Sequence, residues 1–237
     1  MTTIYGIFGW PVAHSLSPAM HNAAFHALDM DSVYVPFAVP PEQLKGALQA
    51  LVALDIRGVN LTLPHKHNVL PLLDEIEPSA QLIGAVNCVS NVKGRLLGSN
   101  TDAPGLVHAL LSEGIEIKNK QVTMVGAGGA ARAAIVGLAE AGASTINLLA
   151  RRIDQAKHLV MDLQTHIQTQ LIPHDLQTVD INIIQRTELL IQASSATLHN
   201  SHEAQTLIKQ LHVTSINPAA VIVDLAYGPH GTPLTRA

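Results

Sequence analysis

The sequence is poor in residues that define several protein classes. Cys88 is the single cysteine, which excludes an internal disulfide and favours a reducing compartment. No apolar run is long enough to cross a membrane. The residues after Met1 lack the basic start and apolar stretch of a signal peptide. We therefore expect a globular cytoplasmic protein without membrane contact.

Charged and aromatic residues are also scarce, at 14% and 3% of the chain. The net charge is −4 and no basic tract with interleaved aromatic residues is present, so we expect no nucleic-acid partner. Thirteen histidines are present, but the pairs His65 with His67 and His199 with His202 lack the Cys or carboxylate ligands of a metal site. We therefore expect no bound metal ion.

Apolar residues make up 47% of the chain and are mostly Ala, Val, Leu and Ile, which is typical of alternating helices and buried strands. In the first half, strands are predicted over 4–9, 32–39 and 58–63, and helices over 41–53 and 68–76. A further helix follows Ser17, which is interpreted as its N-cap, with Pro18 at the first helical position. These segments predict a βαβ-like domain.

In the second half, strands are predicted over 121–125, 145–149, 188–193 and 220–225, and helices over 104–113, 130–141 and 153–170. Strands that alternate with helices in this way favour a doubly wound parallel sheet. The expected fold class is therefore α/β, with an N-terminal α/β domain followed by a Rossmann-like domain.

A glycine-rich turn follows the strand over 121–125. Gly126-x-Gly128-x-x-Ala131 fits the dinucleotide fingerprint, in which the first glycine allows a tight turn and the second lets the backbone approach a pyrophosphate. The next helix presents free N–H groups to the phosphates. Packing without a ligand is the alternative for such a turn. The residues expected to bind the cofactor here are Gly126, Ala127, Gly128, Gly129 and Ala130.

The residues after the next strand indicate which nicotinamide nucleotide binds. An Asp or Glu there would bind the ribose hydroxyls of NAD and repel a 2′-phosphate. This sequence has Arg151 and Arg152 instead, and its first acid is Asp154. Guanidinium groups bind phosphate well, so NADP is the expected cofactor. The alternative is that both arginines only begin a solvated helix.

Four peptides of the first half carry hydroxyl, amide and charged side chains at strand ends or helix starts, where open α/β sheets bind ligands. They are Gly-Trp-Pro-Val-Ala-His-Ser-Leu-Ser-Pro-Ala-Met-His-Asn over 9–22, Gly-Val-Asn-Leu-Thr-Leu-Pro-His-Lys over 58–66, Gly-Ala-Val-Asn over 84–87 and Gly-Ser-Asn-Thr-Asp-Ala-Pro-Gly over 98–105. With the glycine-rich turn, they resemble the shikimate dehydrogenase family over nearly the whole chain.

The resemblance implies a site and a reaction. Lys66 and Asp102 match the catalytic pair of the family. The substrate-binding positions are matched by Ser15, Ser17, Thr62, Asn87 and Tyr227, and cofactor contacts are expected from Ser194 and Leu225. The implied reaction is the reversible, NADPH-dependent reduction of 3-dehydroshikimate to shikimate in chorismate and aromatic amino acid biosynthesis, by a monomer or homodimer. A quinate/shikimate dehydrogenase of the same family and a catalytically silent NADP-binding sensor remain alternatives.

The residue types also fit this chemistry by themselves. Reduction of a ketone needs a hydride donor and a proton donor at the carbonyl oxygen. The ammonium of Lys66, just after a strand, can donate that proton, and Asp102 can orient it and bind a neighbouring hydroxyl. A polyhydroxylated substrate needs Ser, Thr and Asn partners once water is excluded.

The expected domains are residues 1–102 for the substrate and 103–225 for NADP, with 226–237 leading back to the substrate domain. Three departures from the family pattern are found. Ala-Arg-Arg over 150–152 replaces Asn-Arg-Thr, and Gln-Ala-Ser-Ser-Ala-Thr-Leu over 192–198 replaces Asn-Ala-Thr-Ser-x-Gly-Met. The family's terminal helices, which supply a Gln to the ligand, do not follow Ala237, so weaker substrate binding is expected for the 237-residue form.

Overall fold

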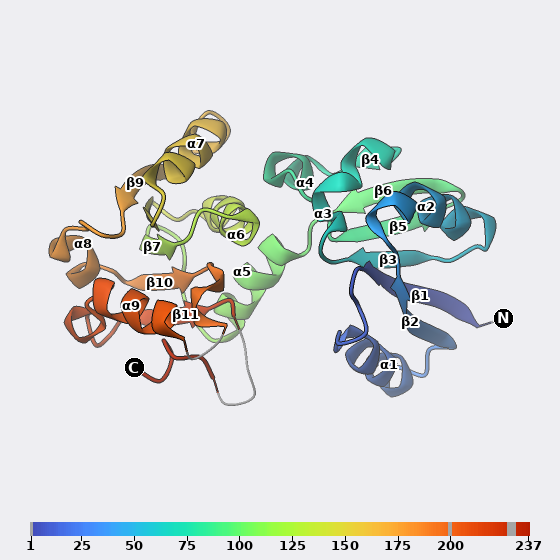
Figure 1. Ribbon diagram of the computed structural model, residues 1–237, viewed down its shortest axis with the longest axis horizontal. Helices are drawn as coiled ribbons and strands as arrows, with labels where there is room; N and C mark the ends of the chain where they lie inside the picture. The colour runs from blue at the N-terminus through green and yellow to red at the C-terminus, as the bar shows by residue number, and fades with distance from the viewer. Residues whose placement is uncertain (1, 199–200, 227–230) are drawn as a thin grey trace. The chain divides into compact units, whose positions relative to one another are not determined.

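The computed structural model describes residues 2–198, 201–226 and 231–237 (Figure 1). The chain divides into two compact units, Met1–Thr101 and Asp102–Ala237, and each unit has a sheet of its own. Among the described residues, no helix is long and apolar enough to cross a membrane.

The first unit is built on a six-stranded mixed sheet with the order β2-β1-β3-β5-β6-β4. Its strands are β1 (Thr3–Gly9), β2 (Ser32–Ala38), β3 (Gly58–Leu61), β4 (Glu75–Ile76), β5 (Cys88–Val92) and β6 (Arg95–Ser99). β1 is parallel to β2 and β3, whereas β5 is antiparallel to β3 and β6. The carboxyl ends of β1 and β3 and the amino end of β5 therefore meet at one edge of the sheet.

The helices of the first unit are α1 (Ser17–Ala27), α2 (Leu44–Ala53), α3 (His65–Asn68) and α4 (Pro78–Ile83), with 3-10 turns at Pro41–Gln43 and Leu70–Leu72. α2 buries Leu44, Leu48 and Leu51, which follow the three-to-four-residue spacing of one helix face. These leucines pack with Phe8 and Val59 of the sheet. The apolar pattern of α2 thus covers one face of the sheet.

Two sequence predictions for the first unit are wrong. Residues 68–76 do not form one helix, because α3 ends at Asn68, a 3-10 turn holds Pro71, and the chain then becomes extended into β4. Proline lacks the N–H that a continuing helix needs. Ser17 is the first residue of α1 rather than its cap, and its N–H donates to the Ser15 Oγ at 3.3 Å.

The second unit has a five-stranded parallel sheet with the order β11-β10-β7-β8-β9. Its strands are β7 (Gln121–Val125), β8 (Thr145–Ala150), β9 (Gln170–Asp175), β10 (Leu189–Gln192) and β11 (Val221–Asp224). The chain starts at the central β7, proceeds outward through β8 and β9, and then returns to build β10 and β11 on the other side. This is the doubly wound order of a Rossmann fold, which confirms the predicted fold class.

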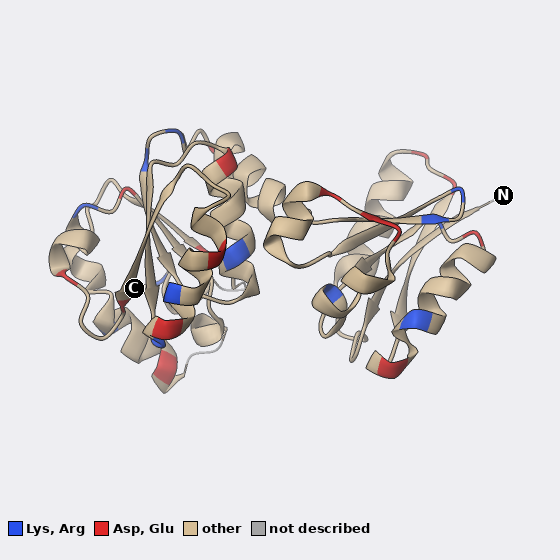
Figure 2. Ribbon diagram, turned by 90° about the horizontal axis from the view of Figure 1, so that it is seen from above, with Lys and Arg blue, Asp and Glu red and all other residues tan. Residues whose placement is uncertain are grey.

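Helices lie on both faces of this parallel sheet (Figures 1 and 2). They are α5 (Asp102–Ser112), α6 (Gly129–Glu140), α7 (Ile153–Gln164), α8 (Ile181–Gln185) and α9 (His202–Gln210). α6 is buried along most of its length and packs closely on α5, because a Cβ added at Gly137 would lie 2.8 Å from the Ala103 carbonyl oxygen. Small residues in α6 therefore allow this close helix contact.

The predicted helix over 153–170 is too long. α7 ends at Gln164, and the following residues form β9, which the sequence patterns did not indicate. β9 contains Pro173 and ends in His174 and Asp175, but it is the edge strand of the sheet, where one side of the backbone needs no partner. A proline is tolerated there.

Most charged residues lie on helices and turns (Figure 2). In the strands of the described residues, charged Lys, Arg, Asp and Glu occur only at strand ends, at Glu75, Arg95, Asp175 and Asp224. The interiors of the strands are free of ionisable Lys, Arg, Asp and Glu because both sheets are covered by apolar side chains. The polar groups that carry chemistry are therefore found at the sheet edges.

Candidate active site

The loops after β1 and β3 lie side by side at one edge of the first sheet. The Thr62 N–H donates to the Phe8 carbonyl oxygen at 3.0 Å. A Cβ added at Gly9 would lie 2.4 Å from the Thr62 Cγ2, so glycine is needed for this approach. The loop that follows carries Ser15 and Ser17, both half-buried and joined by the hydrogen bond already described. Two of the sequence-predicted binding elements thus leave the sheet together.

The loop that carries Lys66 is tied to the peptide over 84–87. The Lys66 carbonyl oxygen accepts the Val86 N–H at 2.8 Å. One residue on, the His67 Nδ1 donates to the Gly84 carbonyl oxygen at 2.7 Å. Because Asn87 follows directly, these two bonds fix the backbone of a predicted catalytic residue against that of a predicted substrate-binding residue.

The same peptide is held from its other side by the residues that precede Asp102. The Asn87 Oδ1 accepts the Thr101 N–H at 2.8 Å and the Thr101 hydroxyl at 3.2 Å. The Asn100 Nδ2 donates to the Ala85 carbonyl oxygen at 3.0 Å. Two of the other three peptides singled out in the sequence, over 58–66 and 98–105, are therefore bonded to the segment over 84–87. Asp102 itself is the first residue of the second unit.

A series of hydrogen-bonded side chains that the sequence did not indicate supports the backbone of Asn87. The Tyr34 hydroxyl donates to the Asn60 Oδ1 at 2.7 Å, and the Asn60 Nδ2 donates to the Asn87 carbonyl oxygen at 3.2 Å. The Asn22 side chain in turn bonds both backbone groups of Tyr34, at 2.8 and 2.9 Å. Burial, with a smaller contribution from Cys88, raises the pKa of Tyr34, so its hydroxyl remains a donor.

His65 anchors the other end of the Lys66 segment. The ring is fully buried, and its Nε2 donates to the Val39 carbonyl oxygen at 2.8 Å. No hydrogen-bond partner for its Nδ1 lies among the described residues, so Nε2 is the ring nitrogen that donates. Lys66 is half-buried between two anchored histidines. This arrangement limits where its ammonium can reach.

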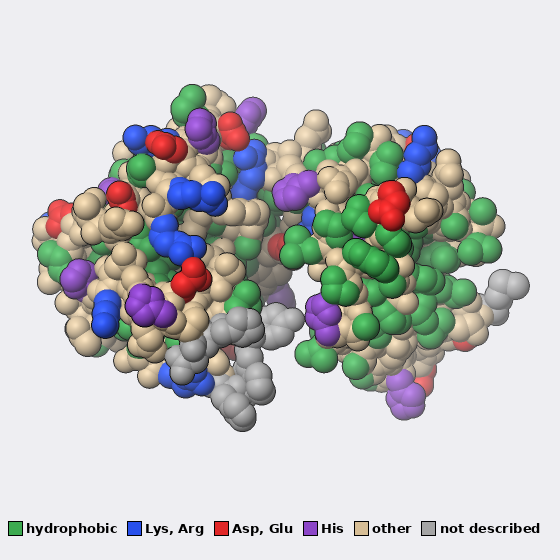
Figure 3. All heavy atoms as spheres, viewed as in Figure 1, with side chains coloured by type: hydrophobic (Ala, Val, Ile, Leu, Met, Phe, Trp, Pro, Cys, Tyr) green, Lys and Arg blue, Asp and Glu red, His purple; other side chains and the backbone are tan. Residues whose placement is uncertain are grey.

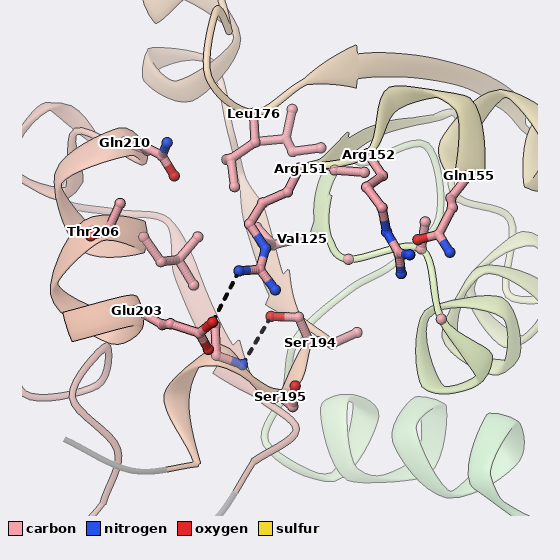
Figure 4. A pocket seen from close by; sticks show the side chains of 18 of the residues that line it. Val125, Arg151, Arg152, Gln155, Leu176, Ser194, Ser195, Glu203, Thr206 and Gln210 are labelled. Carbon is pink, nitrogen blue, oxygen red and sulfur yellow. Dashed lines mark hydrogen bonds and ion pairs between the residues drawn. The ribbon is translucent and has the colours of Figure 1, made fainter. Parts of the chain in front are cut away.

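In the second unit, a cleft opens at the carboxyl ends of β7, β8 and β10 (Figure 4). Its volume is about 490 Å³. Of the predicted cofactor residues, those that line it are Gly126, Ala127, Gly128, Arg151, Arg152 and Ser194. Gly129 and Ala130 begin α6, and the Leu225 N–H donates to the Gln192 carbonyl oxygen at 2.9 Å; these three are not among the described lining residues.

The glycine-rich turn lies where the strand order reverses, between β7 and β10. Gly126 has a φ of +109°, and a Cβ added there would lie 3.1 Å from the Ser194 backbone nitrogen. At Gly128, by contrast, no described atom lies within 4 Å of an added Cβ. The first glycine is thus required by the fold, and the second leaves the space that an approaching phosphate group would use.

Basic side chains gather beside this turn, on the face of the second unit between α7 and α9 (Figure 3). Arg151 and Arg152 directly follow β8, and both are exposed. The Arg151 Nη1 lies 3.3 Å from the Oε1 of Glu203, the second residue of α9 (Figure 4). Glu203 also lines the cleft and was missed by the sequence analysis.

The stretch over 192–198, which departs from the family pattern, is held by its own side chains. The buried Gln192 accepts the Ser194 N–H at 2.6 Å and donates to the Thr197 hydroxyl at 2.6 Å. Thr197 donates in turn to the Asp224 Oδ1 at 3.0 Å. This network fixes Ser194 at the cleft without a glycine in the turn. Tyr227, the predicted substrate contact further along, lies outside the described residues.

Comparisons with known proteins identify both units. Residues 7–89 match the model of the shikimate dehydrogenase substrate binding domain, and residues 108–230 match that of shikimate / quinate 5-dehydrogenase. Shikimate dehydrogenase (NADP(+)) from Geobacter metallireducens is 40% identical over 237 residues, which cover 98% of this chain and 81% of that protein.

Solved structures agree with these matches. Shikimate 5-dehydrogenase from Listeria monocytogenes, in complex with shikimate and NAD, has a TM-score of 0.90 and 32% identity over 99% of this chain and 82% of that one. The Thermus thermophilus enzyme, in complex with NADP(H) and shikimate, has a TM-score of 0.80 and 36% identity over 96% and 80%. This chain therefore belongs to the shikimate dehydrogenase family.

Proposed function

We propose that this protein is an NADP-dependent shikimate dehydrogenase, which reversibly reduces 3-dehydroshikimate to shikimate in the pathway to aromatic amino acids. The observation that carries the proposal is the convergence of the peptides bearing Lys66, Asn87 and Thr101 at one sheet edge of the first unit. The 40% identity to a named NADP-dependent shikimate dehydrogenase supports the same reaction.

The first unit supplies the groups that a polyhydroxylated acid requires. Ser15 and Ser17 are proposed to bind the substrate carboxylate, because their hydroxyls lie on one turn at the start of α1. Thr62 and Asn87 are proposed to bind ring hydroxyls at the same sheet edge. Tyr227 is proposed as a further contact. Each buried hydroxyl of the substrate needs such a partner once water is displaced.

The second unit fits NADP. The turn from Gly126 to Gly128 leaves room beside the start of α6, whose free N–H groups attract phosphates. Arg151 and Arg152 follow the next strand, where a 2′-phosphate would be bound. Ser194 is proposed to lie along the nicotinamide side of the cleft. When bound, NADPH supplies the hydride for the reduction.

Lys66 is the proposed proton donor. Its ammonium donates a proton to the carbonyl oxygen as that oxygen gains negative charge, and in the reverse direction the neutral amine accepts the proton from the hydroxyl. Asp102 is proposed to orient Lys66 and to bind the hydroxyl next to the reacting carbon. The hydrogen bond from the Val86 N–H to the Lys66 carbonyl oxygen supports this role by holding the Lys66 backbone.

The test is turnover by the purified chain, followed by the loss of NADPH absorbance with 3-dehydroshikimate. Reverse reactions with shikimate and with quinate separate the two family activities, because the family model for residues 108–230 covers both. Turnover of 3-dehydroshikimate is expected. NADPH binding without turnover of either substrate would instead identify a sensor and overturn the proposal.

Location and assembly are further proposals. Cys88 is free, which is compatible with the reducing cytoplasm. A monomer or a homodimer is expected, and light scattering of the purified protein measures which of the two forms.

The His67 ring is expected to affect turnover through Lys66. Replacing His67 with Ala removes the 2.7 Å bond to the Gly84 carbonyl oxygen, so kcat is expected to fall about two- to tenfold, the cost of one hydrogen bond. The loss of unfolding free energy should stay below about 1.5 kcal/mol because the ring is exposed. Steady-state kinetics and thermal unfolding measure both quantities.

His67→Asn provides the matched rescue, because the Asn Nδ2 stands at the same distance from the backbone as the histidine Nδ1 and can donate to Gly84. This variant should recover most of kcat. His26→Ala, which removes an exposed histidine from α1, should leave kcat unchanged. Equal kcat values for His67→Ala and the unmodified protein would contradict the positioning role.

A further inference from the structure

The proposed 2′-phosphate site contains an acidic residue as well as the two arginines. Glu203 lies on α9 and approaches Arg151 from across the cleft, with 3.3 Å between the Oε1 and Nη1 atoms (Figure 4). Both side chains are exposed, at 61% and 59%, and both line the cleft. The pair therefore stands in the space where the adenosine end of a nucleotide is expected.

The position of Glu203 is fixed by α9 and not by its ion pair with Arg151. It lies in the first turn of α9, where the helix dipole favours a negative charge. The same turn is capped by Ser201, whose Oγ accepts the Ala204 N–H at 3.3 Å. The carboxylate therefore remains beside the cleft when Arg151 turns to another anion.

The two arginines differ in whether an acidic side chain pairs with them. Arg152 lies beside Gln155, whose N–H donates to the Arg152 carbonyl oxygen at 3.0 Å (Figure 4). Within the part of the chain that the structure describes, no acid lies within ion-pair distance of Arg152. Arg152 is thus available to a phosphate, whereas Arg151 already has an anionic partner.

We propose that Glu203 is a specificity-determining residue that competes with the 2′-phosphate of NADP for Arg151 and so narrows the preference for NADPH over NADH. A 2′-phosphate carries up to two negative charges, so it must displace Glu203 from Arg151 and accept its repulsion. NADH has only a hydroxyl at this position, so its binding neither displaces Glu203 from Arg151 nor is opposed by charge repulsion from Glu203. The inference rests on the proposed function only in taking this cleft as the nucleotide site.

The test is the binding of NADPH and NADH to the full chain with Glu203→Gln, measured by nucleotide fluorescence without substrate. The dissociation constant for NADPH is expected to fall about three- to tenfold, in the range of an exposed ion pair plus the lost repulsion. The constant for NADH should change by less than about twofold, since NADH has no 2′-phosphate for the Glu203 carboxylate to repel. An unchanged or weaker affinity for NADPH overturns the inference.

Asp162→Asn is the matched control. Asp162 is 60% exposed and pairs with Arg132 at 3.1 Å in the same unit, but it does not line the cleft. This variant removes the same charge and should leave both affinities unchanged. In an Arg151→Ala background, Glu203→Gln should lose most of its effect; an equal gain in both backgrounds would exclude competition for Arg151.

The outcome is separable from that of the proposed reaction. Binding of both nucleotides without turnover would refute the reductase while still testing Glu203. Normal turnover with an unchanged ratio of NADPH to NADH affinity in Glu203→Gln would refute the inference alone. Thermal unfolding of each variant identifies any that fails to fold, and Glu203→Ala then serves as a second variant.

Discussion

Replacing Lys66 with alanine is expected to lower kcat for 3-dehydroshikimate reduction by about 10²- to 10⁴-fold, which is the usual contribution of a general acid. The reason is that the carbonyl oxygen gains negative charge during reduction and the variant offers no ammonium to protonate it. NADPH affinity should be unchanged because Lys66 belongs to the first unit and the cofactor cleft to the second.

The substitution is well suited to separate chemistry from folding. The carbonyl oxygen of Lys66 accepts the Val86 N–H at 2.8 Å, and alanine keeps this backbone bond. Lys45→Ala is the control, because it removes an exposed lysine from α2 of the same unit. The role of Lys66 is rejected if its alanine variant, folded and binding NADPH, retains more than about a tenth of kcat.

Four of the five strands of the second unit, β7, β8, β10 and β11, could be predicted from the sequence because apolar residues dominate them. The runs over 121–125 and 188–193 hold mainly apolar residues, and helical patterns separate several of the strands. The glycine-rich turn then locates the ligand edge, since this turn follows the first strand of such a sheet. Local pattern and global topology agree here.

The elements missed from the sequence include β9 and α4, whose local patterns do not indicate them, and also α8 and α9. β9 carries Pro173 and polar residues, and it is stable only because β8 pairs with one of its edges. α4 is short and ends at Gly84, which has a left-handed φ of +71°. The β9 sequence does not alternate between apolar and polar residues, and α4 is too short to show a helical period, so only packing reveals them.

The proposed site residues also fall into two groups, those that local motifs indicate and those that only the fold brings in. Lys66, Asn87 and Arg151 stand in local motifs and could be found by reading the sequence. Tyr34 and Glu203, in contrast, act on those motifs from β2 and α9, 26 and 52 positions away from Asn60 and Arg151. No spacing rule links such pairs, because the fold alone brings them together.

Replacing Gly128 with alanine is expected to raise the dissociation constant for NADPH about tenfold to hundredfold. An added methyl group would occupy the open space of the cleft where the pyrophosphate approaches the backbone. Steric overpacking of this kind costs about 1–3 kcal/mol, which is about fivefold to 150-fold in affinity and includes the expected range. Nucleotide fluorescence measures the change, and NADH should lose affinity to the same extent because both nucleotides share the pyrophosphate.

Gly126→Ala separates the requirement of the fold for a glycine in this turn from the requirement of the cofactor. Gly126 has a φ of +109° and faces the Ser194 backbone at 3.1 Å, so alanine there should lower the unfolding free energy by about 1–3 kcal/mol. Gly128 has an extended backbone with a φ of −93°, so its alanine variant should unfold within about 1 kcal/mol of the unmodified protein. Gly46→Ala, in α2, is the control that should spare NADPH binding. Unimpaired NADPH binding by Gly128→Ala would mean that the cofactor does not approach this turn.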